Sequence, residues 1–344
     1  MITIDGGAKS GSGTIVRYSV ALASLLGKEI RIQNIRARRD KPGLRAQHLK
    51  VVQACQEMCH GLVENATVGS KEITYTPGGR FNGGEYSWDI GTAGSTTMMA
   101  QTLLPLACFA RKPSKFRLEG GLFQDFASSA YHMKFVLLPF LRQMGVQTEF
   151  DIIRPGYVPR GGGVVEIRVA PGGKLKPLNL TEQGEIFNIK GIALSSHLKA
   201  KRVSQRMAEE CRKLLSSYGY KVEIEKIEDE SSLQEGAVLA IYVETSRGNR
   251  MGSDRAGRPG RSSESIGRYV AERFIEDVKT GAAVDRYIAD QLIIYGGLAD
   301  GVTRYSVPHI TEHVETNLWL IEEFLGARTK IDGNLVEIVG IGFA

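Results

Sequence analysis

Hydrophobic and polar positions along the chain alternate between a helical period and a strand period. The segment 14–27, TIVRYSVALASLLG, carries an apolar stripe at helical spacing, and KEIRIQNI after it alternates like a strand. Helix-like and strand-like segments then follow each other in the same way: LRAQHLKVVQACQEMC and KEITYTP, TMMAQTLLPLACFA and KFRLEGG, AYHMKFVLLPFLRQMG and VQTEFDII. We expect successive α/β units, each with one or two helices laid on a small sheet.

Two turn-rich segments enclose a region with a different organisation. They are APGGKLKPLN at 170–179 and TSRGNRMGSDRAGRPGRSSES at 245–265. From the first of them the pattern predicts a β-α-β-β-α order, with helices at about 199–218 and at IGRYVAERFIEDVKTG. This favours a small inserted domain over 181–280, within a large domain made of 1–180 and 281–344. The chain then returns to a helix at 284–295, a strand, a helix at 311–325 and a final strand pair.

The composition is that of a globular protein with a nucleic-acid or phosphate-rich partner. Of 344 residues, 42% are hydrophobic and 24% charged, and the net charge of +6 favours a polyanionic partner. The loop 247–261 carries five arginines among glycines and serines. We expect this loop to be mobile, and either to contact nucleic-acid phosphates or to be simply solvated.

Cellular location is indicated by the cysteines and by the lack of membrane signals. The start MITIDGG resembles no signal peptide, and the longest uncharged segment, between Asp89 and Arg111, contains enough polar residues to predict a buried helix rather than a membrane span. The cysteines have no zinc-finger spacing and predict buried, reduced thiols in a cytoplasmic compartment. They are Cys55, Cys59, Cys108 and Cys211.

Three stretches have the chemistry of phosphate binding. IDGGAKSGSGTIVR leads from a strand through a glycine-rich turn into a helix, which offers backbone N–H groups to an anion, although it matches no P-loop. RARRDKPGLRAQHL places four arginines at a strand–turn–helix junction, and arginine binds phosphate in bidentate fashion. The three consecutive glycines at 161–163 predict either a strand bulge or a backbone lying flat against a ligand.

The stretch VPHITEHVETN contains H-x-x-E-H, the residue order of one class of zinc peptidases. However, Thr311 is a good N-cap, so the helix should begin there and leave His309 outside it. His313 then lies in the first turn, where the helix dipole disfavours imidazolium. A neutral imidazole suits attack on a phosphoryl or nucleotidyl centre, and a buried core histidine is the alternative.

Together these stretches resemble the RNA 3′-terminal phosphate cyclases. The resemblance rests on IDGG…GSG…R, RARRDKPGLRAQHL, IGTAGSTTMMAQTLLP, GYVPRGGGVVEI, YIADQL and TEHVETNLWLIEEF, in the family's order and spacing. It implies an α/β (α+β) fold: a large domain of three repeated βαβαββ-like units with a smaller inserted α/β domain. It also implies the ATP-dependent conversion of an RNA 3′-phosphate to a 2′,3′-cyclic phosphate, through covalent histidine-AMP and RNA-adenylate intermediates, with Mg²⁺ or Mn²⁺ on the triphosphate.

The resemblance also implies roles for individual residues. His313 matches the nucleophile, and the partners implied are ATP and RNA with a 3′-phosphate end, without a membrane. No residue is expected to be a dedicated metal ligand, and the oligomeric state stays open. The ATP-contacting positions match Arg17, Gln101, Tyr287 and Asp290, and the phosphate-contacting positions match Arg36, Arg39, Gln47 and His48.

Three departures from the family pattern leave alternatives open. Ser10 stands where the family usually has a glutamate that helps to hold the metal, and GGLFQDFASSAYH (120–132) replaces a proline-rich turn near the nucleotide. Pro155 stands where a basic residue is usual. The alternatives are a non-catalytic RNA-binding relative in RNA processing or ribosome assembly, and a nucleotidyl-transferring paralogue with another polynucleotide end or nucleotide.

Overall fold

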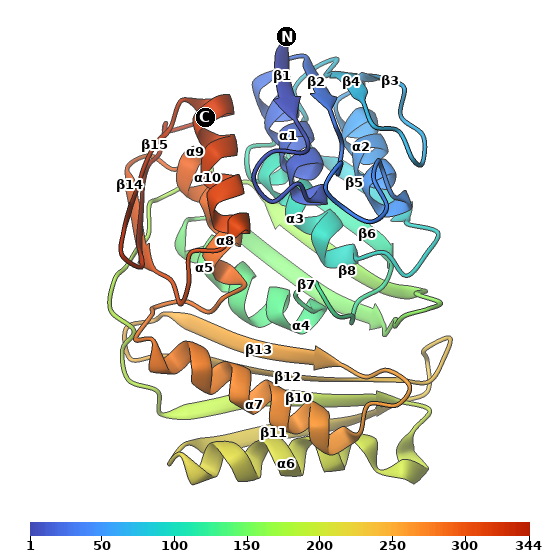
Figure 1. Cartoon of the computed structure of the whole chain (residues 1–344), viewed down its shortest axis with the longest axis vertical. Coiled ribbons are helices and arrows are strands. Elements are labelled where there is room, and N and C mark those ends of the chain that lie inside the picture. Colours follow the sequence, from blue (N-terminus) through green and yellow to red (C-terminus); the bar gives the residue numbers. More distant parts are fainter.

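The chain folds into three units that share one strand order, together with a fourth sheet inserted into the third unit (Figure 1). The computed structural model describes all 344 residues. Each unit has the chain order βαβαββ: its first two strands pair in parallel, and its fourth lies antiparallel between the second and third. The sheets are β1-β2-β4-β3, β5-β6-β8-β7 and β9-β14-β16-β15. The predicted fold class and its repeated units are confirmed.

The first two units follow each other without interruption. In the second unit, the predicted helix at 130–145 contains a π-helical turn, η1, just before Pro139. The first unit comprises β1 (Ile2–Asp5), α1 (Gly13–Leu26), β2 (Ile30–Gln33), α2 (Ala46–Met58), β3 (Leu62–Glu64) and β4 (Ile73–Thr76). The second comprises β5 (Gly84–Asp89), α3 (Thr96–Cys108), β6 (Ser114–Gly120), α4 (Ala130–His132), η1 (Met133–Leu137), α5 (Leu138–Gln143), β7 (Gln147–Arg154) and β8 (Gly163–Ala170).

The third unit is split by the insert, which follows its first strand. The helix expected as one element at 284–295 is wrong: two short helices meet at Leu292. The first begins late because Asp285 Oδ1 accepts hydrogen bonds from the amides of Tyr287 and Ile288. The unit comprises β9 (Asn179–Leu180), α8 (Ile288–Gln291), α9 (Ile293–Leu298), β14 (Val302–Ser306), α10 (Glu312–Leu325), β15 (Arg328–Asp332) and β16 (Leu335–Val339).

The insert is a four-stranded sheet, β11-β10-β12-β13, with two long helices (Figure 1). Those helices, α6 and α7, pack on one face over a hydrophobic cluster of their own, while the other face lies toward α4 and η1 of the second unit. The expected domain limits at 180 and 280 stay a prediction. The elements are β10 (Asn188–Ser196), η2 (Lys199–Lys201), α6 (Val203–Ser217), β11 (Lys221–Asp229), β12 (Gly236–Glu244), β13 (Arg250–Ala256) and α7 (Ser263–Lys279).

The expectation of a mobile loop at 247–261 is wrong, because this segment contains β13. The strand pairs antiparallel with β12, which makes the insert β-α-β-β-β-α. Its centre reads Gly252-Ser253-Asp254, a sequence of low strand propensity that hides it from pattern analysis. The pairing with β12 and the burial of Ser253 and Asp254 override that propensity.

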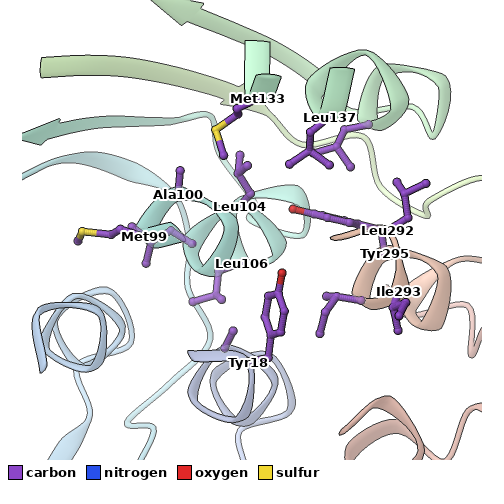
Figure 2. Close-up of a cluster of buried hydrophobic side chains, with 14 of the residues drawn as sticks. Tyr18, Met99, Ala100, Leu104, Leu106, Met133, Leu137, Leu292, Ile293 and Tyr295 are labelled. Carbon is purple, nitrogen blue, oxygen red and sulfur yellow. The ribbon is translucent and has the colours of Figure 1, made fainter. Parts of the chain in front are cut away.

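The main hydrophobic core lies where helices of all three units meet. Helix α1 packs against α2, α3 and α10, and twelve of its fourteen residues are buried. Figure 2 shows part of this core, with Tyr18 of α1, Leu104 of α3, Leu137 of η1 and Tyr295 of α9 directed into one apolar cluster. The three units therefore share a single core.

Two further expectations concern single elements. The uncharged segment between Asp89 and Arg111 forms the buried helix α3, as predicted. All four cysteines are free and buried, as predicted. No helix in the protein combines the length and the apolar character that crossing a bilayer requires.

The shared core predicts that shortening one side chain at its centre strongly lowers the free energy of unfolding. Leu104 is fully buried, so Leu104→Ala should lower the free energy of unfolding by roughly 2–5 kcal/mol through lost contacts and a cavity. Urea denaturation measures the change. Leu62→Ala, at an exposed position in β3, is the matched control and should change it by less than roughly 0.5 kcal/mol. Equal effects of the two substitutions would contradict the shared core.

Candidate active site

A cavity of about 300 Å³ opens where the N-terminal ends of α1, α3 and α10 come together. The three helices come from the three different units, and each contributes side chains from its first turns. Helix N-termini carry partial positive charge and unpaired N–H groups, so this junction attracts anions. The lining residues are Thr14, Arg17, Tyr18, Met98, Gln101, Phe126, Ala127, Ser128, Arg286, Tyr287, Asp290, Gln291, Thr311 and His313.

All five residues expected to hold ATP or attack it line this one cavity: Arg17, Gln101, Tyr287, Asp290 and His313. They lie far apart in the sequence and come from all three units. Their juxtaposition is a feature of the structure, and their roles stay a prediction.

Arg17 is the cation of the cavity that no carboxylate neutralises through a salt bridge. It is buried, and its Nη2 donates to Thr14 Oγ1 at 3.0 Å, which fixes the guanidinium beside the glycine-rich turn. Burial lowers the pKa of Arg17. Arg286 also lines the cavity, but it is paired with Asp277 at 2.7 Å. Arg17 is therefore the guanidinium available to a phosphate.

His313 is held in the first turn of α10. The hydroxyl of Thr311 accepts a hydrogen bond from the amide of Val314, so the helix begins as predicted and the exposed His309 lies outside it. The pKa of His313 is lowered, mainly by burial and further by the charges of Arg17 and Arg39. The lowered pKa agrees with the expected neutral imidazole, with burial rather than the helix dipole as the main cause. Nδ1 is buried without a partner, which leaves Nε2 as the accessible ring nitrogen.

Burial also raises the pKa of two cavity groups from the third unit. Burial raises the pKa of Asp290 to about 7, and the charge of Arg17 only partly opposes this shift. Burial likewise raises the pKa of Tyr287, whose ring stands edge-on to His132 with centroids 5.2 Å apart. Near neutral pH the cavity therefore contains a half-protonated carboxyl group and an un-ionised phenol.

A serine between two glutamines forms part of the cavity wall that sequence reasoning missed. Ser128 Oγ accepts from Gln101 Nε2 at 3.3 Å and from Gln291 Nε2 at 3.2 Å. The Ser128 carbonyl accepts from Thr97 Oγ1 at 2.8 Å. Ser128 belongs to the turn GGLFQDFASSAYH, whose departure from the family pattern was the signal that could have found it.

The four residues expected to bind phosphate in the basic segment lie outside the cavity lining. Arg39 nevertheless influences the cavity. Its Nη2 donates to the Ser10 carbonyl at 3.2 Å, and its charge lowers the pKa of His313. Arg36 instead donates to the carbonyls of Lys41 and Gly43, which braces the turn. Of these two arginines, only Arg39 has a charge that reaches the cavity.

Gln47 and His48 are engaged with neighbouring helix ends. Gln47 Oε1 accepts from the amide of Ser95, the N-cap of α3, at 3.2 Å. His48 is buried against Gly13, where a Cβ atom would lie 2.0 Å from its Nε2. Burial and then the charge of Arg17 lower the pKa of His48 to about 3. His48 is therefore neutral and offers a phosphate a hydrogen bond at most.

Ser10 connects the glycine-rich turn to the helix that carries His313. Its amide donates to Thr316 Oγ1 at 3.2 Å, and its hydroxyl lies 3.0 Å from both Ser12 Oγ and Thr316 Oγ1. Thr316 is on the same face of α10 as His313, three residues further on. The short buried side chain at position 10 therefore joins the first and third units.

The side chains around the cavity do not fit a divalent cation held by the protein. Mg²⁺ and Mn²⁺ prefer carboxylate and other oxygen ligands, whereas the side chains of Ser10, Ser12 and Thr316 are hydroxyl groups already bonded to each other. The one carboxyl group of the cavity, on Asp290, is partly protonated. No group of three or more His, Cys, Asp or Glu side chains is arranged as a metal site.

Comparison with known proteins agrees with this geometry. A family model described as RNA 3′-terminal phosphate cyclase matches residues 8–331. The chain belongs to the RNA 3′-terminal phosphate cyclase family. A relative of that name from Pyrococcus furiosus is 37% identical over 337 residues, which covers 98% of this chain and 97% of the relative. A second, from Caldivirga maquilingensis, is 39% identical and covers 96% and 94%, respectively.

Family membership confirms the resemblance, and the match extends over nearly the whole chain. A third relative of the same name, from Desulfurococcus amylolyticus, is 38% identical and covers 100% of this chain and 99% of its own length. The insert and the repeated units alike thus lie within the region that matches the family.

The raised pKa of Asp290 predicts that replacing its carboxyl group by an amide stabilises the fold to an extent that depends on pH. A carboxyl group whose pKa rises from 3.8 to about 7 on folding destabilises the fold, because the unfolded chain ionises at a lower pH; this cost accumulates as pH increases from 3.8 to about 7 and is fully present above it. Asp290→Asn should therefore increase the free energy of unfolding by roughly 3–5 kcal/mol at pH 8 and by only roughly 1–2 kcal/mol at pH 5. Urea midpoints at the two pH values measure the difference.

Asp151→Asn, at an exposed position of β7, is the control for this experiment and should change the free energy of unfolding by less than roughly 0.5 kcal/mol at either pH. An Asp290→Asn variant that loses stability at pH 8 would show that the carboxylate is stabilised, not desolvated, in the folded protein.

Proposed function

We propose that this protein is an ATP-dependent RNA 3′-terminal phosphate cyclase with His313 as its covalent nucleophile. The observation that carries the proposal is the position of His313: a neutral imidazole with an accessible Nε2, in one cavity with Arg17 and at the N-terminal end of α10. A neutral nucleophile beside positive charge suits attack on a phosphate ester.

In the first step, the Nε2 lone pair of His313 attacks the α-phosphorus of ATP, and the bond to the bridging oxygen of pyrophosphate breaks. Negative charge develops on the non-bridging oxygens of the α-phosphate. Arg17, the N–H groups at the ends of α1 and α10, and the charge of Arg39 stabilise it. Tyr287, Gln101 and Asp290 are proposed to hold the nucleoside.

In the later steps, the RNA takes over the adenylate. An oxygen of its 3′-phosphate attacks the α-phosphorus and the bond to His313 breaks, which regenerates the imidazole. The neighbouring 2′-hydroxyl then attacks the 3′-phosphorus, loses its proton, and expels AMP to give the 2′,3′-cyclic phosphate. The basic segment with Arg36, Arg39, Gln47 and His48 is proposed to contact the RNA phosphates, with His48 as a neutral donor.

The expected Mg²⁺ or Mn²⁺ is proposed to arrive bound to the triphosphate, since the donor groups of the chain do not fit a dedicated site. When bound to the triphosphate, such an ion would supply positive charge to the pyrophosphate that leaves. The four free, buried cysteines support the proposal of a reducing, cytoplasmic compartment.

One observation favours a second candidate, an RNA-binding relative that does not convert RNA ends. Ser10 is fully engaged with Ser12 and Thr316, so the turn beside the cavity contributes no carboxylate toward a triphosphate. The retention of His313, Arg17 and Asp290 in one cavity favours the enzyme.

Covalent labelling tests the nucleophile. With α-³²P-ATP and Mg²⁺ or Mn²⁺, the wild type should acquire a label that is labile in acid and stable in alkali, as expected for a phosphoramidate. His313→Ala should abolish the label, and the exposed His309→Ala, in the same stretch, should retain it. Undiminished labelling of His313→Ala would refute the assignment of the nucleophile.

Conversion of RNA ends separates the enzyme from the binding protein. An oligoribonucleotide with a 3′-phosphate should become resistant to phosphatase when incubated with wild type and ATP, because the cyclic phosphodiester has no terminal monoester. The same RNA with a 2′-deoxy terminal nucleotide lacks the attacking hydroxyl, so it should stop at the adenylated end and keep a label from α-³²P-ATP, which the cyclised strand loses as AMP. Tight binding of the RNA without conversion would favour the second candidate.

A further inference from the structure

Phe126 is an aromatic side chain left in solvent at the mouth of the cavity. Its exposed fraction is 98%, the highest of any large hydrophobic side chain in the protein, and it lines the cavity that contains His313. Burying a ring of this size normally stabilises a fold substantially, so a fully exposed ring points to a ligand that covers it.

The backbone of Phe126 adopts an uncommon conformation. Its φ of +69° lies in the left-handed region, which costs a residue other than glycine about 1 kcal/mol or more. Such a conformation persists only where the neighbouring structure imposes it. The ring is thus held outward by the chain on both sides of it.

On one side, Asp125 is fixed by three arginines of the insert. Arg261 binds it in bidentate fashion at 2.9 and 2.8 Å, and Arg255 approaches at 3.4 Å. These bonds, first the hydrogen bond from Arg261, lower the pKa of Asp125. Arg258 lies 3.7 Å away and remains 66% exposed. The arginine-rich segment thus holds this turn in place.

On the other side, Ser128 is fixed by Gln101, Gln291 and Thr97 through the hydrogen bonds described above. One residue before Phe126 the chain is therefore attached to the insert, and two residues after it the chain is attached to α3 and α8. The backbone of Phe126 is thus fixed on both sides, while its ring stays exposed.

We propose that Phe126 stacks on the terminal nucleobase of the RNA end, an inference that rests on the proposed function. Unpaired bases stack on exposed aromatic rings whatever their sequence, because every base has a π-face. The exposed guanidinium of Arg258, beside the same turn, is placed to neutralise a phosphate of the strand that carries the base.

The order of binding assigns the base to the RNA and not to ATP. The adenylate on His313 occupies the cavity when the RNA end reaches the same phosphorus. The terminal nucleotide must then lie across the rim, which is where Phe126 stands. Under the proposed function, Tyr287 and Gln101 hold the base of ATP, and these side chains are half-buried and buried in the cavity lining, whereas Phe126 is exposed.

A binding cycle tests this assignment. The probe is a fluorescent oligoribonucleotide with a 3′-phosphate, compared with the same strand lacking only its terminal base, and anisotropy measures the Kd of the full-length protein for each. Phe126→Ala should weaken binding of the intact strand by roughly 5–100-fold, the range of stacking on one base. It should leave binding of the abasic strand unchanged, and Phe126→Trp should restore the wild-type Kd.

The controls separate folding, ATP binding and function. Because the ring is exposed, Phe126→Ala should unfold at the wild-type urea midpoint, and Phe187→Ala, at a 64% exposed site in the insert, should change neither Kd. Labelling by α-³²P-ATP without RNA should be as fast in Phe126→Ala as in the wild type.

Two results would overturn the assignment. An equal loss of affinity for intact and abasic strands would mean that the ring contacts something other than the base. Slower labelling by ATP with unchanged RNA binding would assign the ring to the base of ATP. If the wild type takes no label at all while the binding cycle behaves as expected, the proposed catalytic function fails and the stacking site stands.

Discussion

The burial of α1 on nearly all sides is the constraint on which the rest of the structure depends. A helix with twelve of fourteen residues buried needs neighbours around its whole circumference, and a single βαβαββ unit supplies only its own sheet and α2. The other neighbours are α3 from the second unit and α10 from the third. Packing them around α1 brings three helix N-termini to one point, and the cavity lies there.

The same burial sets the ionisation of the site. Removing water lowers the pKa of His313 and raises that of Asp290, because in both cases the charged form is disfavoured. The junction is left with a neutral imidazole, a partly protonated carboxyl group and the positive charge of Arg17. Such a site suits an anion, because an ionised carboxylate would repel it and a neutral imidazole does not lose its free lone pair to a proton.

The insert takes part in the site through the turn that precedes α4. Arginines of the insert bind Asp125, and Asp254 of the insert accepts from the Ser129 amide at 3.0 Å. The Gly252 amide of the insert donates to Asp285 at 2.7 Å. Asp285 in turn caps α8 next to Tyr287 and binds the buried His132 at 2.9 Å. The insert thus braces the second and third units beside the cavity, which explains how a separate sheet influences residues that line it.

The sequence by itself determined the repeated α/β units, the buried α3 and the start of α10 at Thr311, because periodicity and capping act over a few residues. Only the tertiary structure decided which side chains meet. It made Gly252-Ser253-Asp254 a strand, divided the helix at Leu292, and buried His48 as a neutral group. Each of these depends on partners distant along the chain, whose pairing and desolvation leave no local pattern in the sequence.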